Sequence, residues 1–194
     1  MPVKIQVKKP LAHSVKIAAA TIAVFAFVAL LTRFFGTHDN GNADHQSSQW
    51  HVYFSPGGGC SDAIVQKLGE SKSTVLVQAY SFTSEAIAQA LVDAKKRGVT
   101  VSVILDKVEQ REPHSEGSFL SHADIRTLID GAHAIDHNKV MIIDNETVIT
   151  GIFNFTVAAE EKNAENLLII TDKALAQRYT ENWYVHAAHS NPLP

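Results

Sequence analysis

Short runs of Val, Ile and aromatic residues alternate with longer amphipathic stretches between residues 50 and 188. Such runs, bounded by Gly, Pro, Asn or Ser, are typical of strands. Strands are therefore expected at 50–54, 74–80, 99–105, 139–143, 147–150 and 166–171. Apolar residues spaced three or four apart predict helices from 61 or 62 to about 71, from 83 or 84 to 97, and from 175 to 188. The alternation predicts an α/β fold, in which helices pack on a sheet.

The segment 107–122 interrupts this alternation. It is polar and mixed in charge, and it predicts a long loop with a short helix near Phe119. Long loops in compact domains often form the rim of a functional site, but a solvated connection fits this sequence equally well. By contrast, the two strands expected at 139–143 and 147–150 are three residues apart, which predicts a hairpin.

The first 48 residues differ in composition from the rest. Residues 1–15 are basic, residues 16–35 are apolar and 36–48 form a polar linker, which leaves 49–190 as one globular domain. Lysines followed by an apolar run are the pattern of a secretory signal peptide. The uncharged core of this run, 17–31, is short for a bilayer span, which needs about 20 residues, although Phe34 and Phe35 extend it. A cleaved signal peptide and an uncleaved hydrophobic helix that anchors the chain both fit.

The charge is unevenly distributed. Residues 1–36 contain five basic residues and no acidic one, so the remainder holds 12 basic and 20 acidic residues, a balance of −8. An acidic domain is not typical of a strong non-specific nucleic-acid binder, although a local basic patch can serve that purpose. Cys60 is the only cysteine, which excludes an intrachain disulfide.

The candidate chemistry begins at residue 137. His137 and Lys139 are two positions apart on an expected strand, so their side chains point to the same face, and Asp144 follows five residues later. An imidazole beside an ammonium suits an anionic substrate, because the lysine neutralises charge and the neutral imidazole can attack phosphorus or move a proton. Asp136, immediately before the histidine, could raise the pKa of His137.

Two further segments complete this set of candidates. Gly151 permits close backbone approach, and the amide of Asn154 can donate to a phosphate oxygen. Glu165 precedes the last expected strand, and its carboxylate could accept a hydrogen bond from the second ring nitrogen of His137 and fix the tautomer. Each piece alone is weak evidence, but the ordered combination on expected strands is much more specific.

These residues resemble the HKD signature of the phospholipase D superfamily. The match consists of His137-x-Lys139-x-x-x-x-Asp144, then Gly151-x-x-Asn154, then Glu165-Asn166. The strings at 52–56, 79–83, 94–99 and 153–156 are similar to the short bacterial Nuc-like endonuclease branch, which has one motif per chain. The resemblance covers about residues 50–188 and implies a mixed β-sheet flanked by helices on both faces, preceded here by an N-terminal hydrophobic helix.

The resemblance also implies a role for each residue. His137 would be the nucleophile that forms a phosphohistidine, and a second His137 from another subunit would be the general acid. Lys139 and Asn154 would bind the phosphate oxygens, Glu165 would orient His137, and Asp144 would be mainly structural. No metal or other cofactor is expected. Since the chain holds one motif, a homodimer with the active site at its interface is expected.

The sequence departs from the family pattern at Ile152, where the family usually has serine, and at Val157, where the nuclease branch often has a basic residue. Strand alternation would place Ile152 on the same face as Asn154, toward the phosphate. Three functions remain open: a metal-independent nuclease with little sequence preference, a phospholipase D or phosphatidyl transferase acting on phospholipid, and an impaired family member that only binds nucleic acid.

The expected location follows from the N-terminal segment. The basic end stays cytoplasmic and the rest crosses the membrane. We therefore expect the domain in a bacterial periplasm, secreted, or outside the cytoplasm on an inner membrane to which an uncleaved 16–35 segment attaches it.

Overall fold

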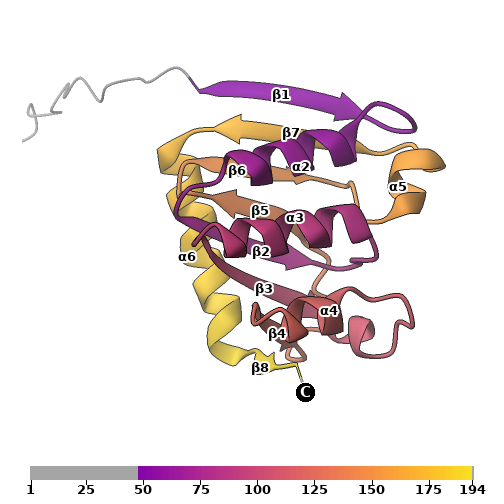
Figure 1. Cartoon of the computed structure of the whole chain (residues 1–194), viewed down its shortest axis with the longest axis vertical. Coiled ribbons are helices and arrows are strands. Elements are labelled where there is room, and N and C mark those ends of the chain that lie inside the picture. Colours follow the sequence, from indigo (N-terminus) through magenta and orange to yellow (C-terminus); the bar gives the residue numbers. More distant parts are fainter. Residues whose placement is uncertain (1–47, 194) are drawn as a thin grey trace, which may run out of the picture. The chain divides into compact units, whose positions relative to one another are not determined.

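The computed structural model describes residues 48–193, which form one mixed eight-stranded sheet with helices on both faces (Figure 1). The strand order is β1-β7-β6-β5-β2-β3-β4-β8, and only the β2–β3 and β3–β4 pairs are parallel. The strands are β1 (Gln49–Phe54), β2 (Thr74–Ala79), β3 (Thr100–Asp106), β4 (Arg126–Asp130), β5 (Lys139–Ile143), β6 (Thr147–Gly151), β7 (Asn166–Thr171) and β8 (Asn191–Pro192). The helices are α2 (Cys60–Glu70), α3 (Glu85–Lys96), α4 (Gly117–His122), α5 (Val157–Glu161) and α6 (Lys173–His189), with a 3₁₀ turn at Lys107–Gln110.

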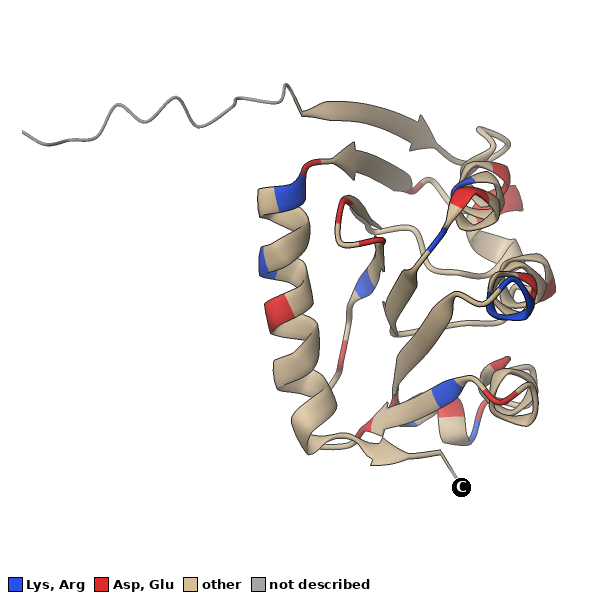
Figure 2. Ribbon diagram, turned by 60° about the vertical axis from the view of Figure 1, so that its left-hand side comes forward, with Lys and Arg blue, Asp and Glu red and all other residues tan. Residues whose placement is uncertain are grey.

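Helices α2, α3 and α4 cover one face of the sheet and α6 covers the other (Figures 1 and 2). The alternation of β2 shows why both faces are filled. Val75 and Val77 pack into the core under α2 and α3, whereas Leu76 packs with Trp183 of α6. The Trp183 indole N–H donates to the carbonyl oxygen of Val77 at 2.8 Å, which ties α6 to the middle of the sheet.

The expected α/β fold with helices on both faces is therefore confirmed for residues 48–193. None of the helices in this range is long and apolar enough to cross a bilayer. The hydrophobic helix at 16–35, the basic region at 1–15 and nearly all of the linker at 36–48 lie outside the described residues.

The helix ends show which local signals were reliable. Ser84 caps α3 as expected, since the Ile87 N–H donates to its hydroxyl. The capping prediction for α2 was wrong, because this helix already begins at Cys60 and has no side-chain cap of its own. Glu160 of α5 supplies that function instead, and its carboxylate accepts from the Gly59 and Ser61 N–H groups at 3.0 and 2.8 Å.

The segment 107–122 contains the expected short helix, α4, which includes Phe119. Strand β4 was not anticipated from the sequence, and neither was the five-residue helix α5. The last three residues of the β4 sequence, Leu-Ile-Asp, gave too short an apolar run to separate from a loop. This omission matters, because β4 ends at Asp130 and leads into the loop that carries His137.

Candidate active site

His137 lies in the loop immediately before β5, and Lys139 is the first residue of that strand. The imidazole of His137 is exposed to solvent, whereas the Lys139 side chain is buried. The Lys139 ammonium donates to the carbonyl oxygen of His137 at 2.9 Å. The structure therefore brings together the two residues that the sequence proposed as nucleophile and phosphate ligand.

Tyr80 completes this arrangement. It directly follows β2, which pairs with β5 so that Ala79 lies opposite Lys139. The Tyr80 ring contacts the His137 ring edge-on, with centroids 4.7 Å apart, and the Lys139 Nζ atom lies 4.9 Å from the tyrosine centroid. Sequence reasoning treated Tyr80 only as the end of a strand. The pairing of β2 with β5, which the sequence did not reveal, is what places it here.

The electrostatics of Lys139 follow from its burial. Desolvation lowers the pKa of its ammonium from the ordinary value, and the negative charges of Glu165 and Asp136 partly oppose that shift. A buried ammonium beside a solvent-exposed imidazole needs an anion, because its own hydration is incomplete. The phosphate of a diester would supply one.

Asn154 and Glu165 lie together on the adjoining segments. The Asn154 backbone N–H donates to Glu165 Oε2 at 2.9 Å, and the Asn163 side-chain amide donates to Oε1 at 2.7 Å. The Glu165 N–H in turn donates to the Ser55 hydroxyl. The Oδ1 atom of Asn154 is buried and has no hydrogen-bond partner among the described residues.

Between residues 48 and 193, no hydrogen bond joins the Glu165 carboxylate to the His137 ring; amide donors occupy both of its oxygens. Glu165 still influences the site through its charge, which acts on Lys139. Its role in orienting His137 stays a prediction.

The chain turns away from the sheet directly after Gly151. Strand β6 ends there, and the Ile152 and Phe153 N–H groups both donate to the carbonyl oxygen of Asn166 at 3.2 Å. Ile152 is 55% exposed. Strand β6 does not continue beyond Gly151, so the placement of Ile152 on the face of Asn154, which assumed a continuous strand, stays a prediction.

We expect Gly151→Ala to cost about 2–3 kcal/mol of folding free energy. Gly151 has a φ of +145°, and a Cβ there would clash with the carbonyl oxygen of Asn166. Urea denaturation followed by circular dichroism measures the loss. Gly69→Ala is the matched control, because this helical glycine has open space around it and alanine favours helix by about 1 kcal/mol. Equal stability of the two variants would contradict the prediction.

Asp144 lies at the other end of β5, about 17 Å along the strand from Lys139. Its carboxylate accepts hydrogen bonds from the backbone N–H groups of Lys72, Ser73 and Thr74 and from the Ser73 hydroxyl. Burial alone would raise the pKa of Asp144, but these donors outweigh it and lower the pKa below its usual value. The contacts are those of a structural residue that joins the β5–β6 turn to the start of β2.

Asp136 does not face His137. It lies on the α6 side of the sheet, where Gln78 donates to one carboxylate oxygen at 2.8 Å and the Asn138 amide donates to the other at 2.6 Å. Its own N–H donates to Asp106 at 2.6 Å. These contacts fix the loop that precedes Lys139, so the carboxylate is turned toward structural partners and not toward the imidazole.

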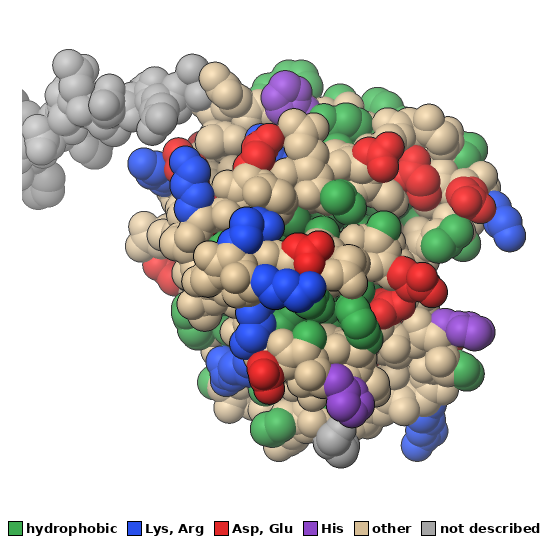
Figure 3. Space-filling model, in the orientation of Figure 1, with side chains coloured by type: hydrophobic (Ala, Val, Ile, Leu, Met, Phe, Trp, Pro, Cys, Tyr) green, Lys and Arg blue, Asp and Glu red, His purple; other side chains and the backbone are tan. Residues whose placement is uncertain are grey.

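Two open hollows meet at Tyr80. One, of about 810 Å³, continues past Thr83 and Asn154; the other, of about 570 Å³, continues past Lys107 and Arg111. Acidic residues, namely Glu85, Glu112 and Glu116, line the larger hollow. Figure 3 shows that charge is unevenly distributed over the face covered by α2, α3 and α4. Lys and Arg gather at one end of this face, and Asp and Glu lie toward the other. The basic end comprises Lys67, Lys72, Lys95, Lys96 and Arg97, near the carboxyl ends of α2 and α3.

Comparisons with known proteins agree with this geometry. Residues 64–184 match the family model described as "Cardiolipin synthase, PLD-like domain". The chain belongs to the phospholipase D superfamily. It is 42% identical to a protein of Rickettsia typhi named phospholipase D, over 71% of this chain and 68% of that protein. It is 32% identical to the mitochondrial cardiolipin hydrolase of Xenopus laevis, over 63% and 58% of the two chains.

Solved structures of the superfamily share the fold. Nuc from Salmonella typhimurium, described as a phospholipase D family member, is 35% identical and superposes with a TM-score of 0.73 over 76% of this chain and 99% of its own. NucT from Helicobacter pylori superposes with a TM-score of 0.70 over 76% and 100%, at 19% identity, which shows the fold alone. As a superfamily member with one HKD motif, the chain is a phosphodiesterase-type protein.

Proposed function

We propose that this chain is a metal-independent phosphodiesterase that hydrolyses its substrate through a phosphohistidine on His137. The observation that carries the proposal is that the exposed His137 imidazole and the buried Lys139 ammonium both lie against the ring of Tyr80, with the ammonium donating to the His137 carbonyl oxygen. The imidazole is accessible to a phosphorus atom, and the ammonium lies where the negative charge of the transition state develops.

The proposed chemistry has two steps. In the first, a ring nitrogen of His137 attacks phosphorus, the bond to the leaving oxygen breaks, and a second imidazole gives that oxygen a proton. In the second, water attacks the phosphohistidine, the same second imidazole accepts the water proton, and the P–N bond breaks to release the phosphate monoester. Lys139 and Asn154 hold the non-bridging oxygens throughout. Positive side chains provide the electrostatic stabilisation in both steps.

We propose nucleic acid as the substrate, cleaved internally and with little sequence preference. Tyr80, which contacts His137, lines both hollows, so a polymer that occupies the two would pass beside the imidazole. A lipid headgroup needs only one of them. The identity with Nuc across nearly all of that chain supports the same choice. The acidic lining predicts binding that is weak and governed by local contacts, with a shallow dependence on salt.

A phospholipid is the second candidate. Ile152 and Val157 are exposed apolar residues within three positions of Asn154 in the sequence, and relatives bear the names phospholipase D and cardiolipin hydrolase. Both candidates are tested together by incubating the purified chain in EDTA with supercoiled plasmid and, separately, with cardiolipin vesicles. If the parent nicks the plasmid and the His137→Ala variant does not, the nuclease proposal is supported. Phosphatidic acid release without nicking would transfer the proposal to lipid, and loss of nicking in EDTA alone would contradict metal independence.

The third possibility, an impaired member that only binds nucleic acid, depends on Ile152. The Ile152→Ser variant tests it in the same assay. Because Ile152 points to solvent, we expect the serine variant to cut plasmid at a rate close to that of the parent. Cutting by the serine variant alone would instead identify the natural chain as inactive.

We propose that a homodimer completes the site. The face of β1 and β7 that α6 leaves uncovered carries an apolar stripe, in which Val52 lies opposite Leu168 and Trp50 opposite Ile170. The stripe ends at Phe54, which pairs with Asn166 beside Glu165. Trp50 and Phe54 are each more than 60% exposed, which is unusual for a monomer surface and favours a second copy of this chain as the partner.

We expect Phe54→Asp to dissociate the dimer and to reduce phosphodiesterase activity about 100-fold, because each site then lacks its second histidine. Light scattering coupled to gel filtration gives the mass, and plasmid nicking gives the activity. Val185→Asp, at an equally exposed position on α6, is the control and should change neither. A monomeric parent with full activity would contradict the proposed dimer.

A further inference from the structure

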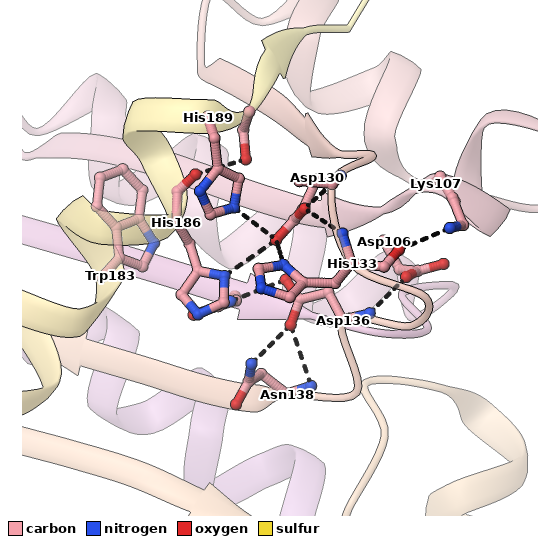
Figure 4. Close-up of polar contacts among 12 residues, drawn as sticks. Asp106, Lys107, Asp130, His133, Asp136, Asn138, Trp183, His186 and His189 are labelled. Atoms are coloured by element: carbon pink, nitrogen blue, oxygen red, sulfur yellow. Dashed lines mark hydrogen bonds and ion pairs between the residues drawn. The ribbon is translucent and has the colours of Figure 1, made fainter.

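A second cluster of titratable side chains lies on the α6 side of the sheet (Figure 4). Asp130 is the last residue of β4, and His133 follows in the loop toward His137. His186 and His189 come from the last turn of α6, where their spacing of three residues puts them on one side of the helix. Sequence reasoning missed this cluster, because its two halves are more than fifty residues apart.

The three imidazoles converge on one oxygen of the carboxylate. Asp130 Oδ2 lies 2.8 Å from His133 Nδ1, 3.0 Å from His186 Nδ1 and 3.2 Å from His189 Nε2. The Asp130 side chain is fully buried, and its other oxygen accepts from the Ala132 and His133 N–H groups.

A carboxylate oxygen has about two lone-pair sites for hydrogen bonds. Three ring nitrogens around Asp130 Oδ2 are therefore more than hydrogen bonding to this atom requires. The three ring centroids are 4.9 to 5.4 Å apart, so the three imidazoles are packed together around this oxygen. The four ligand atoms, one from each residue, all lie within 4.8 Å of one another. A tetrahedral metal with bonds of about 2.0–2.1 Å needs them about 3.3 Å apart, which small side-chain rotations achieve.

We propose that Asp130, His133, His186 and His189 form a binding site for a divalent transition metal, with Zn²⁺ as the best match. Three imidazole nitrogens and one carboxylate oxygen are ligands that zinc accepts, whereas Mg²⁺ and Ca²⁺ prefer all-oxygen sites. Four protein ligands leave no open position, which makes the site structural and not catalytic. None of the four belongs to the HKD motif.

The proposed role of this metal follows from the two segments that carry its ligands. It would link the last turn of α6 to the loop 131–138, which ends beside Lys139 and carries His137. Lys107 already donates to the carbonyl oxygen of His133 at 2.6 Å, and Asp106 accepts from Asp136 farther along the loop. A metal at Asp130 would fix the start of the same loop and stabilise the fold there; since nicking is expected to persist in EDTA, the metal is not needed for the reaction.

The test uses the full chain, stripped with a chelator and dialysed, and titrated with Zn²⁺ in a calorimeter. We expect one tight site per chain, with a Kd of about 1 μM or lower, and a rise in Tm of about 5 °C in excess zinc. Replacing zinc with Co²⁺ should give the visible absorption of a tetrahedral site. The double variant His186→Ala/His189→Ala should lose the tight site, weakening binding at least about 100-fold.

The matched control is His51→Ala/His122→Ala, which removes two exposed histidines outside the cluster and should bind as the parent does. Absence of a tight site in the parent, or equal binding by the two double variants, would overturn the proposal and leave a cluster held by hydrogen bonds alone. His137→Ala should retain zinc binding, so that failure of the proposed nuclease leaves this result intact. Plasmid nicking by the His186→Ala/His189→Ala variant in EDTA would separate the metal from catalysis.

Discussion

His137→Asn is expected to abolish phosphodiester hydrolysis, with a loss in kcat of about 10⁴-fold. Asparagine is close to histidine in size and polarity, but its amide nitrogen is not a nucleophile and cannot accept the phosphoryl group. Since His137 is exposed and its ring meets that of Tyr80 edge-on, the variant should keep the parent's fold and Tm. A chromogenic phosphodiester gives the rate without dependence on the natural substrate.

The covalent intermediate provides an independent readout. Rapid acid-free quenching of the parent with a labelled diester should trap a phosphoenzyme that is stable in base and labile in acid, and His137→Asn should trap none. Lys139→Gln should lower the rate by about 10³-fold, because it removes the ammonium and leaves the imidazole in place. His122→Asn, at an exposed histidine of α4, is the control. Retention of the phosphoenzyme in His137→Asn would assign the nucleophile to another group.

Asp144→Ala is expected to destabilise the domain by about 3–5 kcal/mol. The change removes the acceptor for three backbone N–H groups at Lys72, Ser73 and Thr74. It also puts alanine at a φ of +55°, which favours Asn and Asp. Urea denaturation measures the loss. Asp144→Asn is the control, since it tolerates the backbone and keeps one acceptor oxygen, and it should lose about half as much.

The stability contributed by Asp144 should depend on pH. The folded protein lowers the pKa of this carboxyl, so the unfolded chain binds the proton more readily. The contribution is therefore complete above the unfolded pKa of about 3.9 and disappears as the pH falls through the lower folded pKa. The difference between the parent and Asp144→Asn, measured at pH 7, should shrink when the pH is lowered to 3. A difference that stays constant would show that the charge of the carboxylate is not responsible.

The order of strands and helices was predictable because it depends on local pattern. Runs of branched apolar residues gave β2, β3 and β5, and the Ser84 cap with its apolar stripe gave α3. The short turn at 144–146 gave the β5–β6 hairpin, in which Ile143 pairs with Thr147. The same local reading misplaced the start of α2, because the groups that cap this helix belong to Glu160, about a hundred residues away.

The candidate site, too, was predictable from the sequence only in part. The order and spacing of the HKD residues, with strand alternation for His137 and Lys139, indicated the chemistry from sequence. Only the tertiary structure placed Tyr80 over these two side chains, turned Asp136 toward Gln78, and directed Ile152 into solvent. Sheet pairing and the turn at Gly151 decide these contacts, and neither leaves a periodic signal in the sequence.

The sequence by itself determined the family, the α/β class and the residues that carry the proposed phosphoryl chemistry, because each depends on residue identity at short spacing. Only the tertiary structure brought Asp130 and His133 of the β4–β5 loop to His186 and His189 of α6. It also left an apolar stripe uncovered on β1 and β7. Both features depend on where α6 packs across the sheet. That position is fixed by long-range burial of Trp183 with Leu76 and by its hydrogen bond to the Val77 carbonyl oxygen, which no local pattern encodes.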